Sequence, residues 1–197
     1  ATGDLVWIAE ADDIADPAFL STLVPTFRNE NMVMAFCQSR QIDSNGNVLA
    51  NDYLAYTGDI SDRWKNDHFA DGLREIQESL AIKNVIPNVS GVVFDRRALL
   101  KAMDTVGEKL FEYRMAGDWL VYLHVLAQGQ LYYSAKSLND HRRHQNSVTS
   151  GSALEKHLEE VVSVQRVAHS LAKPDDRVEI QAREYLARLS VQFSHKA

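Results

Sequence analysis

Short apolar runs alternate with amphipathic stretches through the first 150 residues of the chain. The runs at residues 5–9, 32–37 and 130–135 are typical of strands, whereas residues 16–27, 69–82 and 118–129 have the length and apolar spacing of helices. This alternation predicts an α/β domain over residues 1–150, in which helices flank a sheet.

The pattern changes after residue 147, where two long amphipathic stretches are separated by Lys173-Pro174. Helical spacing gives each stretch one apolar stripe. We therefore expect a second unit, an α-helical hairpin over residues 151–197. Its stripes must pack on the sheet domain, on each other, on a second copy of the chain or on another partner protein.

Two stretches between the predicted elements have distinct patterns. The Asn45-Gly46 step separates strand-like residues and predicts a β-hairpin. Residues 51–67 have no clear period and are predicted to form an irregular loop. Trp64 in this loop is able to stack on a sugar, but a loop tryptophan packs back on its own domain more often.

Composition excludes several classes of protein. The 197 residues are 45% hydrophobic, which is enough for a substantial core, and the net charge of −6 argues against a nucleic-acid surface. No stretch is apolar enough to span a bilayer, and the first residues do not resemble a signal peptide. The single cysteine, Cys37, lies in an apolar run and fits a buried thiol in a reducing compartment.

Three carboxylates, Glu10, Asp12 and Asp13, stand within four residues directly after the first apolar run. The run predicts a strand buried on both faces, and ligands of open α/β sheets bind beyond the carboxyl ends of such strands. Carboxylates this close repel one another, so they need raised pKa values or a shared divalent cation. A solvated acidic entry to a helix, with Asp16 as N-cap and Pro17 in the first turn, explains the motif alone about as well.

Asp118 begins a stretch that is apolar nearly all round and ends at Gly129. Such a stretch predicts a buried helix whose first turn points at something enclosed. A carboxylate there is suited to act as a general base, which accepts a proton from a nucleophile during attack. The alternative is that Asp118 is an N-cap that accepts backbone N–H groups.

Together these segments resemble glycosyltransferase family 2, whose catalytic fold is called GT-A. Residues 4–20, DLVWIAEADDIADPAFL, are similar to the family's apolar strand followed by Asp-x-Asp-Asp, a spacer, Pro and Leu. Residues 84–100, residues 115–129 with Asp118-Trp119, and residues 138–147 with their Arg and His extend the similarity. The resemblance implies the carboxyl-terminal part of a GT-A-like sheet domain.

The resemblance also implies a role for each matching residue. Asp12 and Glu10 would hold Mg²⁺ or Mn²⁺, Asp13 would contact the donor, and Asp118 would be the catalytic base. Glu10 stands where the family has Asp, so its longer side chain makes Asp12 and Asp13 the stronger candidates for direct contact. The remaining implied residues are Arg142, Arg143 and His144 at the donor diphosphate, and Ser90, Gly91 and Trp119 on the acceptor side.

The implied activity is inverting, metal-assisted transfer of a sugar from a nucleotide diphosphate donor to a glycan or other hydroxyl acceptor, as in polysaccharide biosynthesis. No Gln-x-x-Arg-Trp motif of processive synthases is present, which favours single-sugar transfer. The chain has no initiating Met and reaches a strand within four residues, so we expect a cytoplasmic fragment, inactive alone, of a protein that works in the cytoplasm or at the inner face of the membrane.

Two other functions fit the same residues. The chain is alternatively a non-enzymatic interaction module that keeps the fold and binds a partner through its helical hairpin. It is also compatible with a different metal-dependent enzyme acting on phosphates through the same acids.

Overall fold

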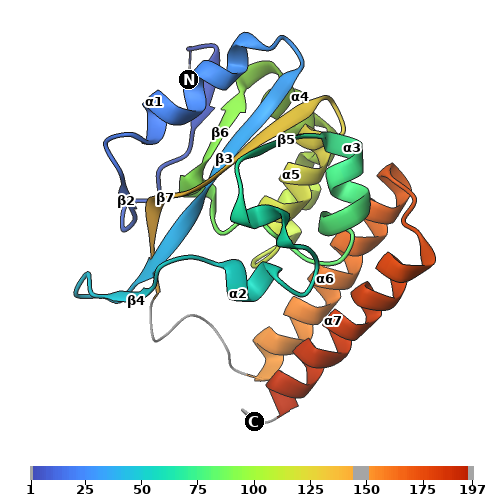
Figure 1. Cartoon of the computed structure of the whole chain (residues 1–197). Coiled ribbons are helices and arrows are strands. Elements are labelled where there is room, and N and C mark those ends of the chain that lie inside the picture. The colour runs from blue at the N-terminus through green and yellow to red at the C-terminus, as the bar shows by residue number, and fades with distance from the viewer. Residues whose placement is uncertain (1, 144–150, 195–197) are drawn as a thin grey trace.

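A mixed seven-stranded sheet forms the centre of the described part of the chain, which is residues 2–143 and 151–194, without the side chains of residues 151–154 and 192–194 (Figure 1). The computed structural model confirms the predicted α/β class, with helices flanking the sheet and two helices at the C-terminal end. The strands are β1 (Leu5–Trp7), β2 (Ile14–Ala15), β3 (Met32–Ile42), β4 (Val48–Ala50), β5 (His68–Asp71), β6 (Val92–Asp95) and β7 (Gln130–Arg142).

The strand order is β1-β6-β3-β7-β2. In this order the C-terminal ends of strands β1, β3 and β7 lie at the same end of the sheet. Strands β3 and β7 are parallel over most of their length, and β6 is antiparallel to both of its neighbours, β1 and β3. Strand β1 therefore runs in the same direction as β3 and β7. The loop after β1, which carries the three acids, lies beside the ends of the two long strands.

Helices of very different length cover the sheet. The α-helices are α1 (Phe19–Leu23), α2 (Leu54–Thr57), α3 (Gly72–Glu75), α4 (Arg96–Val106), α5 (Gly117–Leu126), α6 (Gly151–Leu171) and α7 (Asp176–Ser194). Helix α3 continues as a π-helix over Ile76–Leu80, and 3₁₀ turns span Val24–Arg28, Asp62–Lys65, Val89–Gly91 and Gly107–Glu112. Figure 1 shows α1 on one side of the sheet, with α4 and α5 on the other.

Strand alternation divides the core between the two faces of the sheet. Met34 and Phe36 face the larger core, which α4, α5 and the C-terminal helices cover, whereas Ala35 and Cys37 face a smaller core under α1. Burial raises the pKa of the Cys37 thiol to about 12. Cys37 is therefore a packing residue, as the apolar run predicted.

Several predicted features are confirmed. The β-hairpin joins β3 to β4, with Gly46 at φ 88°, a conformation that glycine adopts without strain. Trp64 is only 1% exposed and packs back into the core, although its loop contains the short helix α2 and a 3₁₀ turn. Helices α6 and α7 form the predicted hairpin, and buried residues of both join the larger core of the sheet domain.

The prediction that the first strand is buried on both faces is wrong. Strand β1 is at the end of the strand order and pairs only with β6, so solvent reaches it. Trp7 is 37% exposed and Ile8 is 44% exposed. An apolar run alone does not distinguish a central strand from an edge strand.

Two predicted helices are also corrected. The first three residues of the expected 69–82 helix, residues 69–71, belong to strand β5, which pairs with β7, and the helix starts only at Gly72. The helix expected after Asp16-Pro17 begins at Phe19 and changes to a 3₁₀ turn at Val24. The Asp16 carboxylate does accept the Ala18 N–H, at 2.8 Å, so Asp16 still orders the chain before α1.

Within residues 2–143 and 151–194, no helix combines the length and the apolarity needed to cross a bilayer.

Candidate functional site

The acidic loop is held against the turn before β6. The backbone N–H of Glu10 donates to the Ser90 hydroxyl at 3.0 Å, and the Trp7 indole donates to the Ser90 carbonyl at 2.8 Å. Ser90 and Gly91 are buried, so neither presents a side chain to the solvent. Ser90, predicted on the acceptor side, thus positions the acidic loop.

Asp13 is the best-anchored acid of the motif. One of its carboxylate oxygens accepts the Asn88 side-chain amide, and the other accepts the backbone N–H of Arg142 at 2.8 Å. The side-chain carbonyl of Asn88 in turn accepts a hydrogen bond from the side-chain amide of buried Asn139 at 2.9 Å. This chain of hydrogen bonds ties the acidic loop to the end of β7.

Asp118 lies in the first turn of α5, two residues after the N-cap position at Ala116. Its carboxylate accepts the backbone N–H of Trp119 at 2.7 Å and the amide of Asn84 at 3.3 Å. Burial raises the pKa of Asp118 to about 6, although these two hydrogen bonds act in the opposite direction. Asp118 is therefore not the N-cap, and its pKa suits a base that works near neutral pH.

Glu10 and Asp118 line the same cavity, although 108 positions separate them in the sequence. The cavity holds about 430 Å³, and His141 near the end of β7 also lines it. Partial burial of the Glu10 carboxyl group raises its pKa even though the residue is exposed overall, and the charges of Asp13, Asp12 and Asp118 raise it further. An acid of the loop after β1 and an acid of α5 thus share one electrostatic environment.

The predicted diphosphate-binding residues have different surroundings. The Arg142 guanidinium donates to the backbone carbonyls of Asp12 and Asp43, at 2.8 and 2.7 Å, so it braces the acidic loop. Arg143 is exposed and lines a neighbouring cavity. His144 lies outside the described residues.

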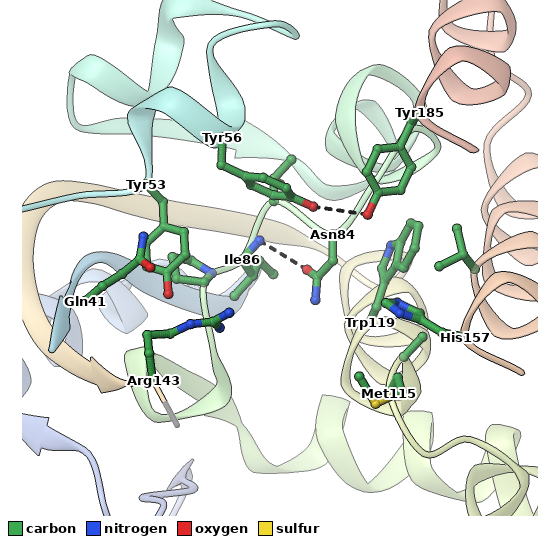
Figure 2. Close-up of a pocket in the computed structure, with 14 residues that line it drawn as sticks. Gln41, Tyr53, Tyr56, Asn84, Ile86, Met115, Trp119, Arg143, His157 and Tyr185 are labelled. Atoms are coloured by element: carbon green, nitrogen blue, oxygen red, sulfur yellow. Dashed lines mark hydrogen bonds between the residues drawn. The ribbon is translucent and has the colours of Figure 1, made fainter. Parts of the chain in front are cut away.

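That neighbouring cavity, of about 480 Å³, is lined by Trp119 (Figure 2). Its wall includes Pro87 and Met115, which also line the cavity of Glu10 and Asp118. Trp119 therefore lines a cavity that adjoins the cavity of the candidate base.

Sequence reasoning missed two polar residues of the site, Asn84 and Asn88. They are single amides in a non-periodic stretch, and nothing in the local pattern marks them. His141 belongs to the His and Arg cluster of residues 141–144, which is a positive spot suited to a diphosphate. Strand β7 extends to Arg142, and a strand places successive side chains on opposite faces, so His141 and Arg142 have different surroundings.

Among the described residues, no group of three or more His, Cys, Asp and Glu side chains is placed to hold a metal ion. Both oxygens of Asp13 accept N–H groups, so Asp13 is committed to holding the loop in place. Magnesium sites that include substrate phosphates often use only one or two carboxylates. A metal ion at this loop would therefore need further oxygen ligands from a bound molecule.

Comparison with models of known protein families gives no match, and comparison with curated protein sequences gives none either.

Proposed function

We propose that this chain belongs to an inverting, metal-assisted glycosyltransferase with a GT-A-like fold, which moves one sugar from a nucleotide diphosphate donor to a hydroxyl acceptor. The observation that carries the proposal is the single cavity lined by Glu10 and Asp118. The resemblance in the acidic loop and the Asp118-Trp119 helix supports it, because both segments contribute to this cavity.

Asp118 is the proposed base. A sugar hydroxyl is a poor nucleophile until a carboxylate accepts its proton. Asp118 takes that proton while the hydroxyl oxygen bonds to the anomeric carbon and the bond from that carbon to the diphosphate oxygen breaks. With a pKa of about 6, the carboxylate is deprotonated at neutral pH yet remains a better proton acceptor than an ordinary aspartate.

Asp12 and Glu10 are the proposed ligands of Mg²⁺ or Mn²⁺. The ion would neutralise the negative charge that develops on the departing diphosphate. The raised pKa of Glu10 supports this assignment, because the carboxylates around it make a nearby cation favourable. Asp13 and Arg142 keep the loop in place rather than binding the donor directly.

The proposal is tested by incubating the full-length protein, since this chain is expected to be inactive alone, with nucleotide sugars of each base, a mixture of glycan acceptors and Mn²⁺. We expect mass spectrometry to detect acceptors heavier by a single sugar residue, and EDTA to abolish the products. A cytoplasmic location is part of the proposal, because nucleotide sugars are the expected donors.

Calorimetry with Mn²⁺ and a panel of nucleoside diphosphates separates this proposal from a pure interaction module. An enzyme of this class binds at least one of them in a metal-dependent way. Ile180 and Val191, exposed on α7, are where a partner protein would bind in the alternative. Partner capture through α7 without any nucleotide binding would contradict the proposal.

A further inference from the structure

Four Tyr and Trp rings line the cavity beside Asp118, together with aliphatic and polar side chains. Tyr53 and Tyr56 flank it from the α2 region, Trp119 from α5 and Tyr185 from α7. Figure 2 shows Tyr53 and Arg143 along one side, Trp119 and His157 along the other, and the hydroxyls of Tyr56 and Tyr185 directed toward each other. Rigid rings around a space of about 480 Å³ suit a ring-shaped ligand with an apolar face.

Contacts on the far side of the Tyr56 ring hold it in place. The Lys83 ammonium lies 4.2 Å from the centre of the Tyr56 ring and donates to Asp59 at 2.7 Å. Arg188 of α7 binds the same carboxylate at 2.8 Å. These contacts link Tyr56 of α2 and the residues that follow it to α7.

A polar side chain connects the wall of this cavity to the proposed base. Asn84 lines the cavity and also donates to Asp118 at 3.3 Å. A hydroxyl-bearing ring in this cavity therefore lies next to the proposed base.

The charge of the lining has one sign. Burial lowers the pKa of His157, which keeps this imidazole neutral at pH 7. Among the described lining residues, Arg143 is then the charged one, and no carboxylate accompanies it. A guanidinium in such surroundings favours a carboxylate or phosphate on the ligand.

We propose that this cavity binds the acceptor, and that the acceptor is a sugar ring carrying an anionic group, either a uronate carboxylate or a sugar phosphate. Its assignment as the acceptor site rests on the proposed function, whereas binding of the anionic sugar does not. The rings stack on the sugar, Arg143 contacts its anionic group, and Asn84 leads to Asp118. Because Tyr185 belongs to α7, the C-terminal hairpin takes part in choosing the acceptor.

The test is saturation-transfer NMR and calorimetry on the complete chain with three probes: methyl glucuronide, glucose 6-phosphate and methyl glucoside. We expect at least one anionic probe to bind about tenfold more tightly than the neutral one, and the tighter probe identifies the acid. Arg143→Gln should remove this preference, whereas Arg183→Gln, which changes an exposed arginine on α7, should leave it intact.

The aromatic wall is tested separately. Tyr185→Leu keeps an apolar side chain but loses the ring, so it should weaken the binding of all three probes. Phe111→Ala, at an exposed aromatic residue, should not weaken it.

Absence of binding by all three probes, or binding unaffected by both Arg143→Gln and Tyr185→Leu, would overturn the proposal. Arg143 is exposed, so its variant remains informative even if Tyr185→Leu melts early. Binding of Mn²⁺ with a nucleoside diphosphate is measured in the same variants. Normal nucleotide binding without sugar binding would contradict only the proposed acceptor site. Sugar binding without nucleotide binding would contradict only the proposed glycosyltransferase function.

Discussion

The carboxylate of Glu160, on α6, accepts the backbone N–H of Ala116 at 3.0 Å, immediately before α5 begins. The same side chain accepts the N–H groups of Arg114 and Met115, at 2.8 and 2.7 Å, and is only 5% exposed. Helix starts leave N–H groups unpaired, and a negative charge there also favours the helix dipole. A residue of the C-terminal hairpin therefore fixes the start of the helix that carries Asp118.

Glu160→Ala should lower the free energy of unfolding by about 2–4 kcal/mol, because it leaves three N–H groups, including the buried one of Ala116, without their acceptor. Glu160→Gln keeps one acceptor and should lose less. Chemical denaturation measures both, with Glu159→Ala, at the exposed neighbouring position, as the control. Equal stabilities for Glu160→Ala and Glu159→Ala would show that the cap has no energetic importance.

The raised pKa of Asp118 makes stability depend on pH. Between pH 4 and about 6 the folded protein keeps a proton on Asp118 that the unfolded chain has lost, so the contribution of this group to the free energy of unfolding falls as pH rises through that window. Asp118→Asn does not titrate. The melting temperature of the native chain, relative to that of the variant, should therefore fall between pH 4 and 6.5.

The same variant tests catalysis. The rate of sugar transfer by the full-length protein should increase as pH rises through about 6, because the base loses its proton there. Asp118→Asn should lower kcat on the order of 10²-fold. Donor binding should survive, because the acidic loop is unchanged. Near-normal turnover in a well-folded Asp118→Asn protein would remove the base from the mechanism.

Gly72 lies so close to neighbouring backbone that adding one methyl group there should strongly lower stability. Gly72 donates its N–H to the Gly129 carbonyl at 2.9 Å, and a side chain on Gly72 would collide with the backbone carbonyl of Leu126. Gly72→Ala should destabilise the chain by about 3 kcal/mol or more, since backbone must move. Gly3→Ala meets only ordinary contact and should change the melting temperature little, which makes it the matched control.

Local patterns predicted the fold class, the β-hairpin at Gly46 and the C-terminal helices, because each depends on neighbours in sequence. The edge position of β1 and the strand at residues 68–71 depend on pairing with β6 and β7. The exposure of residues 68–71 alternates as in a strand. The helical spacing that directly follows these residues made the whole stretch look like one helix. Tertiary pairing decided both cases.

For the site, the sequence identified the acids and Asp118 but not what surrounds them. Asn84 and Asn88 gain their roles from partners 34 and 75 positions away. Glu160 looked like one of many charges on an amphipathic helix, and only the packing of α6 on α5 gives it three N–H partners. Such long-range hydrogen bonds leave no periodic signal.

Asp12 and Asp13 are neighbours with different expected behaviour. Asp13 accepts hydrogen bonds on both carboxylate oxygens, so Asp13→Asn, which keeps one acceptor, should cost about 1–3 kcal/mol of stability. Asp12 is exposed, and Asp12→Asn should leave the melting temperature nearly unchanged while weakening Mn²⁺-dependent nucleoside diphosphate binding about tenfold or more. Differential scanning fluorimetry and calorimetry on the two variants, with exposed Asp104→Asn as the control, measure both effects. An Asp12→Asn protein that binds Mn²⁺ and the diphosphate as tightly as the native chain would exclude Asp12 as a metal ligand, whatever Asp13 does.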